Sequence, residues 1–178
     1  PNTEEKYISF SKIIKYDSGK LNDKGQPIEN KIELRFIDSF KFLPSSLDTL
    51  TQNLIKKQFN EIQRYFPKEN LDLITRKLAY PYEYMNSIET YAETELPTIE
   101  KFYSALTNEH IKESDYENAK QIWEAFNIRN LREFTTLYNK IDVMLLADIM
   151  ENFRNVALKT YKLDPAWYYT TPGFSWDC

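Results

Sequence analysis

The 178-residue chain is 28 % charged and 15 % aromatic, a composition typical of one globular domain and not of a disordered segment. Its three glycines exclude a glycine-rich phosphate loop, and its one cysteine, Cys178, excludes an internal disulfide framework and a cysteine-based zinc site. The single histidine leaves no histidine pair for a metal, and the net charge of −4 by itself argues against nucleic-acid binding, which usually requires a basic patch.

Two strands are predicted near the start of the chain. Residues 7–16, YISFSKIIKY, are rich in β-branched and aromatic residues, and residues 31–40, KIELRFIDSF, alternate between apolar and polar. Between them, residues 17–30 concentrate Gly, Asn, Asp and Pro, which predicts a long hairpin loop and antiparallel pairing of the strands. Asp38 suits either a catalytic carboxylate or the start of a turn after the strand, and we favour the turn.

A helix is predicted to begin after Pro44, with Ser45 as its cap and Asp48 as the reciprocal residue. Its apolar face would consist of Leu47, Leu50, Leu54, Ile55 and Phe59. A short amphipathic segment follows at 60–65, and residues 70–97 lack a regular period, which predicts an irregular but packed segment. There, Tyr80, Tyr82 and Tyr84 fit either one buried face or a stacking platform for bases, and we favour burial.

Two further helices are predicted at 98–106 and 115–126. The second has Ser114 as its cap and Glu117 as the reciprocal residue, and it carries one apolar stripe. Only residues 127–129 separate it from the next helix, so the two helices should pack antiparallel.

The longest predicted helix spans 130–158, with Asn130 as its cap and Glu133 as the reciprocal residue. Apolar residues recur every three or four positions along one face: Phe134, Leu137, Tyr138, Ile141, Leu145, Ile149, Phe153 and Val156. A second set widens this surface nearly all round: Val143, Met144, Leu146, Ala147 and Met150. Such a helix is expected at the centre of the fold.

Asp142 lies within this apolar run, four residues after Tyr138, so the phenol and the carboxylate share a helix face. On pattern alone a helical carboxylate is more often solvated. The alternative is a metal ligand beside a tyrosine that orients a water molecule, because hard divalent cations prefer carboxylate oxygens. One carboxylate does not complete such a site.

The run YNKIDVMLLADIMENFR, which contains Tyr138 and Asp142, resembles the third exonuclease motif of family B DNA polymerases. Four other segments resemble runs of the protein-primed polymerases of viruses, plasmids and mobile elements: FIDSFKFLPSSLDTL, KLAYPYEYM, ETELP and LDPAWYYTTPGFSWD. The resemblance covers 31–178. The resemblance does not extend to the first exonuclease motif of the family, Asp-x-Glu, and the polymerase core motifs Asp-x-x-Ser-Leu-Tyr-Pro, Lys-x-x-x-Asn-Ser-x-Tyr-Gly and Tyr-x-Asp-Thr-Asp do not occur in the chain.

The resemblance implies an α/β fold, a partial ribonuclease-H-like exonuclease domain in which a strand pair is followed mainly by helices. Residues 1–162 would be the C-terminal part of the 3′→5′ exonuclease domain, and 163–178 the start of the polymerase domain. Asp142 would hold Mg²⁺ or Mn²⁺ in the intact parent, and Tyr138 would position the attacking water. The remaining ligands would lie outside this chain, so we expect the fragment alone to be inactive.

Two DNA-binding residues follow from the same resemblance. Ser39 matches the first position of a Ser/Thr-Leu-x-x-hydrophobic pattern, although Phe40 replaces its Leu. Phe40 and Phe42 suit either base stacking or the core. Lys77 matches a Lys-x-x-hydrophobic pattern that assists the exonuclease site, with Lys112 and Lys120 as rival candidates.

The implied partners are DNA and deoxynucleotides, with a terminal protein primer as a further partner in this polymerase type. No apolar run approaches the roughly 18–20 residues that cross a bilayer, and no signal peptide opens the chain, so we expect no membrane partner and an intracellular location in an unspecified compartment. Two other interpretations remain: a non-enzymatic helical module that binds a partner, and a decayed mobile-element remnant.

Overall fold

The computed structural model describes residues 9–105 and 108–178. It has a mixed α/β fold, a two-stranded antiparallel sheet followed by helices, with 51 % of residues in helices and 15 % in strands. The described chain divides into two compact units, one formed by residues up to Pro44 together with Val156–Cys178, the other by Ser45–Asn155. None of the helices in the described residues is long and apolar enough to cross a membrane.

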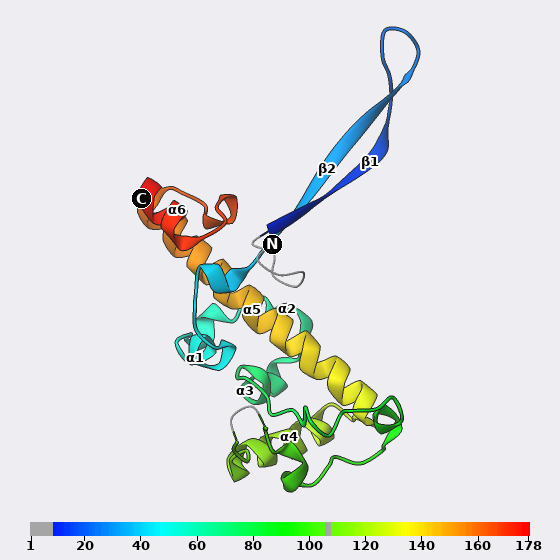
Figure 1. Ribbon diagram of the computed structural model, residues 1–178, viewed down its shortest axis with the longest axis vertical. Helices are drawn as coiled ribbons and strands as arrows, with labels where there is room; N and C mark the ends of the chain where they lie inside the picture. The colour runs from blue at the N-terminus through cyan, green and yellow to red at the C-terminus, as the bar shows by residue number, and fades with distance from the viewer. Residues whose placement is uncertain (1–8, 106–107) are drawn as a thin grey trace. The chain divides into compact units, whose positions relative to one another are not determined.

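The first unit begins with the hairpin of β1 (Ser9–Leu21) and β2 (Pro27–Ile37), the blue ribbon in Figure 1. The strands pair antiparallel, as predicted, with Phe10 opposite Phe36. The predicted long loop is wrong, because the ladder extends to Asp17 opposite Glu29, and the turn comprises only residues 22–26. The Asn22 carboxamide oxygen accepts the N–H groups of Lys24 and Gln26, both at 2.9 Å, and so closes a tight turn. Predicted strand residues 7 and 8 lie outside the described part.

The chain turns directly after β2, at Asp38. Its carboxylate accepts the Phe40 N–H at 3.0 Å and caps the short 3₁₀ helix η1 (Ser39–Lys41), so the turn interpretation of Asp38 is confirmed. Phe42 is 4 % exposed and belongs to the core, whereas Phe40 is 56 % exposed. The core interpretation is therefore right for Phe42 and wrong for Phe40.

The C-terminal segment of the first unit consists of η6 (Pro165–Trp167) and α6 (Thr171–Asp177). The Arg35 guanidinium of β2 donates to the carbonyl groups of Ala166 and Trp167 and lies 5.3 Å from the Trp167 ring centroid. The Thr171 hydroxyl donates to the Lys41 carbonyl at 2.9 Å. These contacts attach the C-terminal segment to the hairpin and to the turn after it.

Short helical turns precede the two long helices of the second unit: α1 (Leu47–Gln52), η2 (Lys56–Gln58), α2 (Ile62–Tyr65), η3 (Lys68–Asn70), α3 (Leu71–Ile74), η4 (Glu89–Ala92) and η5 (Ile99–Phe102). The predicted cap Ser45 is wrong by one position, because it is the Ser46 hydroxyl that accepts the Thr49 N–H at 3.2 Å. The helix predicted at 98–106 is only η5, since the chain bridges between Ser104 and Glu109 instead. Residues 106 and 107 lie outside the described part.

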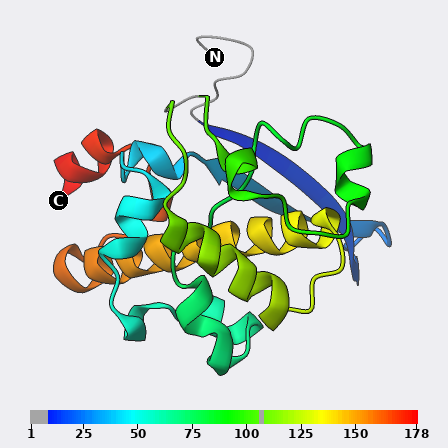
Figure 2. The same cartoon turned by 90° about the horizontal axis from the view of Figure 1, so that it is seen from below.

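The two long helices are α4 (Glu113–Ala125) and α5 (Leu131–Tyr161), which pack together in the second unit with the Trp123 and Phe134 rings 5.8 Å apart (Figure 2). The Asn130 side chain accepts the Glu133 N–H at 3.0 Å, as predicted for a cap. Glu133 instead accepts the Arg129 N–H at 3.0 Å, one residue earlier than a capping box requires. Ser114 is not a cap, because α4 begins before it.

The core of the second unit forms around α5, which confirms the predicted central position of this helix. Its buried apolar residues are Phe59, Ile62, Ile74, Leu78, Ala119, Ile122, Ile128, Leu131, Phe134, Tyr138, Ile141 and Leu145. The α5 members recur every three or four positions, the period of one buried helix face. Outside the core, Val143 and Val156 are exposed, so the predicted burial of Val156 is wrong.

Candidate functional site

Tyr138 and Asp142 lie one turn apart on α5, so both point to the same side of the helix. Tyr138 is 4 % exposed and stands in the core, whereas the Asp142 side chain keeps 23 % of its surface exposed. Asp142 is thus not the freely solvated carboxylate that the pattern alone favours.

Lys77, in the segment after α3, reaches both residues from 61 and 65 positions away in the sequence. Its ammonium donates to the Tyr138 hydroxyl and to Oδ2 of Asp142, and it lies 4.2 Å from the centroid of the Tyr138 ring. The rival Lys120 is paired elsewhere, with Glu117 at 2.7 Å. Of the three candidate lysines, Lys77 is the one whose ammonium the structure places on Asp142 and Tyr138.

Two tyrosines of the same segment complete this cluster. The Tyr80 ring stacks on that of Tyr138 with the centroids 4.5 Å apart, and its hydroxyl is 2.9 Å from Oγ1 of Thr135. The Tyr82 hydroxyl contacts the Tyr138 hydroxyl, but the Tyr82 residue is 60 % exposed. The favoured burial of these tyrosines therefore fails for Tyr82, which lies at the open side of the cluster. The signal in the sequence for a place of Tyr82 in this cluster was its short spacing from Lys77 and Tyr80.

The Tyr138 phenol is held in its protonated form. Burial raises the pKa of Tyr138 far above its ordinary value, and the neighbouring Tyr82 hydroxyl and Asp142 carboxylate raise it further. At neutral pH the group is therefore a hydrogen-bonding phenol and not a phenolate base. It suits the positioning of another group, not the removal of a proton.

The two carboxylate oxygens of Asp142 differ in their hydrogen bonding. Oδ2 accepts from Lys77, whereas the buried Oδ1 has no hydrogen-bond partner among the described residues. Yet the described residues contain no group of three or more His, Cys, Asp or Glu side chains that could hold a metal ion. This chain's described side chains do not make a divalent-metal site by themselves, since Mg²⁺ needs several oxygen ligands.

Ser39, the other DNA-binding candidate, belongs to the first compact unit, where it is the first residue of η1. It is half-buried, and the next residue, Phe40, presents an exposed ring. The structure therefore brings together Lys77, Tyr138 and Asp142 within the second unit, and Ser39 stands in a separate unit from them.

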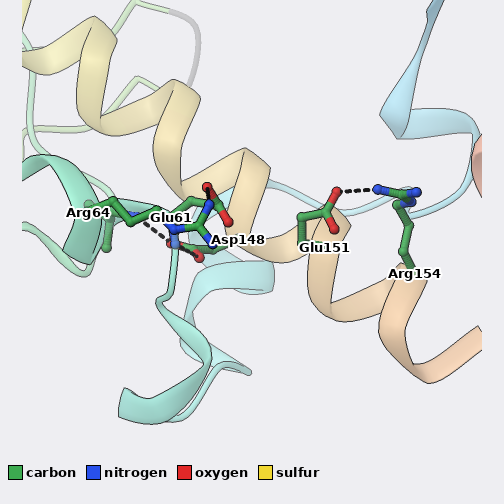
Figure 3. Close-up of polar contacts among 6 residues, drawn as sticks. Glu61, Arg64, Asp148, Glu151 and Arg154 are labelled. Atoms are coloured by element: carbon green, nitrogen blue, oxygen red, sulfur yellow. Dashed lines mark hydrogen bonds and ion pairs between the residues drawn. The ribbon is translucent and has the colours of Figure 1, made fainter. Parts of the chain in front are cut away.

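A second aspartate of α5, Asp148, was not singled out by the sequence. It is 1 % exposed, and its two oxygens accept the N–H groups of Glu61 at 2.7 Å and Ile62 at 3.1 Å (Figure 3). One turn later, the Asn152 amide donates to the Gln58 carbonyl at 2.8 Å. Burial raises the pKa of Asp148, and the backbone N–H groups of Glu61, Ile62 and Asn60 oppose this rise. Asp148 and Asn152 hold the segment at 58–62 against α5. A charged residue inside an apolar helical run was the only sequence signal.

The chain matches no protein-family model, no curated protein and no solved structure.

Proposed function

We propose that this chain is part of a family B DNA polymerase of the protein-primed type and that it contributes residues to a 3′→5′ proofreading exonuclease. One observation carries the proposal: Lys77 contacts both Tyr138 and Asp142, which lie more than sixty residues later in the sequence and one turn apart on α5. They are the three residues of the second unit that the resemblance assigns to an exonuclease site. Beside them Tyr82 offers an exposed ring of the kind on which a base stacks.

Each side chain has a distinct task in this proposal. The protonated Tyr138 hydroxyl orients the attacking water, a task that agrees with its raised pKa. The Lys77 ammonium attracts the anionic DNA backbone to the cluster. Oδ1 of Asp142 supplies one carboxylate oxygen for Mg²⁺ or Mn²⁺, and the other ligands come from parts of the parent protein outside this chain.

The proposed parent fold is a ribonuclease-H-like exonuclease domain up to residue 162, followed by the start of the polymerase domain. Its support is coarse: an antiparallel strand pair that precedes a mainly helical segment. The proposal includes DNA and deoxynucleotides as partners of the parent, with a terminal protein as primer.

The decisive test is Asp142→Ala in the full-length parent polymerase. We expect 3′-end degradation of a mismatched primer to fall by at least about a hundredfold, because a proofreading site loses a ligand, while nucleotide incorporation is unchanged. Asp72→Ala is the matched control, since Asp72 is an exposed carboxylate paired with Lys56 in the same unit. If the Asp142→Ala variant trims the mismatch at the parent's rate, Asp142 is not part of the exonuclease site.

A second candidate function, a non-enzymatic module that binds a partner protein, is favoured by the hairpin. In the β1–β2 register, one face carries six apolar residues, all exposed: Phe10, Ile14, Tyr16, Ile32, Leu34 and Phe36. A two-stranded ribbon with an uncovered apolar face is not expected to be stable by itself. Metal-dependent nuclease activity in the parent that Asp142→Ala abolishes would decide against this candidate as the main function.

A further inference from the structure

Two adjoining hollows run along α5 on the side opposite Tyr138 and Asp142. The larger, about 410 Å³, is lined by Tyr65, Phe66, Pro67, Phe126, Ile128, Glu133, Thr136, Leu137 and Lys140. The smaller, about 340 Å³, is lined by Thr136, Asn139, Lys140, Val143 and Met144. Because Thr136 and Lys140 line both hollows, the two form one continuous surface, which we call the α5 groove.

The α5 groove is separate from the candidate exonuclease site. Lys140 is two residues from both Tyr138 and Asp142, which places it about 200° around the helix from either residue. Two residues of the second apolar set of α5, Val143 and Met144, line the groove beside Leu137 and polar residues of the same helix. Exposed apolar side chains that gather on one surface and have polar residues around them mark an interaction site.

The floor of the α5 groove is aromatic and apolar. Phe66 and Phe126 meet edge to face with their ring centroids 5.9 Å apart. At the rim, Tyr65 is 68 % exposed and Val143 is 59 % exposed. These side chains leave the groove open to solvent along its length, unlike a small-molecule pocket, which encloses most of its ligand.

The length of the α5 groove fits a helical partner. Its α5 lining extends from Glu133 to Met144, about 17 Å or three helical turns. Helix-in-groove recognition uses apolar anchors at positions i, i+4 and i+7 of the bound helix over such a distance. An aromatic floor and an open rim are the surfaces that accept these anchors.

The charge of the α5 groove restricts the partner further. Lys140 stands where the two hollows meet, and among residues 9–105 and 108–178 no carboxylate forms an ion pair with it. Glu133, at the other end, is already bound by the guanidinium and the N–H of Arg129. We propose that the α5 groove binds an amphipathic helix of a protein partner, one that sets apolar anchors on the aromatic floor and an acidic residue against Lys140.

The test uses the complete 178-residue chain and a fluorescein-labelled acidic peptide of about 14 residues, with Leu at i, i+4 and i+7 and Glu between them. Fluorescence anisotropy should show saturable binding. Lys140→Glu and Val143→Glu should each weaken binding by about tenfold or more, because one reverses the charge and the other places a charge on the apolar surface. A peptide with Lys in place of Glu should bind Lys140→Glu better than it binds the unmodified chain.

Val156→Glu is the matched control, since Val156 is equally exposed on α5 but does not line the groove. It should leave peptide binding unchanged, and thermal unfolding should show that all three variants are folded. The proposal is overturned if the acidic peptide does not bind saturably, or if Lys140→Glu and Val143→Glu bind it as the unmodified chain does. Concentration-dependent self-association that Val143→Glu abolishes would assign the groove to a second copy of this chain instead.

Discussion

Helix α5 carries two aspartates six residues apart, and their surroundings differ in almost every respect. Asp142 keeps part of its surface in water, has one oxygen on Lys77 and leaves the other without a partner. Asp148 is fully enclosed, and its two oxygens accept backbone N–H groups from a distant segment. A buried carboxylate whose two oxygens both accept hydrogen bonds has a structural role. A carboxylate with one unpaired oxygen is a candidate for a functional role. The sequence letters alone do not distinguish the two.

The largest expected difference between the two aspartates is in stability. Asp148→Ala should lower the free energy of unfolding by about 2–4 kcal/mol, because it leaves two buried N–H groups without acceptors. Asp142→Ala should lower it by less than about 1 kcal/mol, since the Lys77 ammonium can turn to water. Urea unfolding followed by circular dichroism measures both values. Equal losses would mean that the two carboxylates have the same structural role.

A smaller effect should come from the pair of Lys77 and Asp142 itself. A double-mutant cycle with Lys77→Met and Asp142→Asn should give a coupling energy of about 0.5–1.5 kcal/mol, reduced from that of a buried pair because both side chains are partly exposed. The exposed pair of Lys56 and Asp72 is the control and should couple more weakly. Zero coupling between Lys77 and Asp142 would show that the two groups do not interact in solution.

The pH dependence of stability offers a separate test of Asp148. Because burial raises the pKa of Asp148 above its ordinary value of 3.8, the folded chain binds this proton more tightly than the unfolded chain. The contribution of this group to stability is therefore present in acid and is lost as the pH rises from about 3.8 through the raised value. Glu61 also raises this pKa and lies beside Arg64.

The measurement compares the free energy of unfolding of the unmodified chain and Asp148→Asn across that pH range, so that the titration of all other carboxylates cancels. The free energy of unfolding of the unmodified chain minus that of Asp148→Asn should fall as the pH rises. If this value rises with pH instead, the pKa of Asp148 is lowered, and the backbone N–H groups outweigh burial.

The smallest effect is expected from metal and DNA on the chain alone. Because the described residues contain no group of three or more His, Cys, Asp or Glu side chains that could hold a metal ion, and because the net charge is −4, the purified chain should release no nucleotides from a labelled single strand in Mg²⁺ or Mn²⁺. Its melting temperature should move by less than about 1 °C when either metal is added. Metal-dependent cleavage that disappears in Asp142→Ala would mean that the chain carries a complete site.

Local patterns predicted the parts of the fold that depend on local interactions. The period of three to four residues identified the buried face of α5, the Asn130 cap defined its start, and strand composition identified the hairpin. The same reasoning failed where a few atoms decide, as in the turn that Asn22 closes or the choice between Ser45 and Ser46 as cap. Residues 98–106 have helical spacing, but a bridge between Ser104 and Glu109 stops the helix after one turn.

The candidate site was predictable only in part, for a similar reason. Tyr138 and Asp142 share a helix, so their spacing in the sequence already places them together. The position of Lys77 depends on the path of the chain through the short helical turns α2, η3 and α3, and no local sequence pattern encodes this path. The exposed position of Tyr82 was not the favoured prediction and Asp148 was not singled out, because their partners, Tyr138 and the Glu61–Ile62 backbone, are more than fifty residues away.

The hairpin has a consequence for the handling of this protein. Among the residues described, neither outer edge of the sheet has a further strand beside it, and open edges next to apolar side chains favour aggregation between chains. Lys12, opposite Leu34, is a charged residue on the apolar face of the ribbon. An ammonium group at that position opposes the stacking of one ribbon on another. Replacement of Lys12 by an apolar residue would therefore lower the solubility of the chain before it changed the fold.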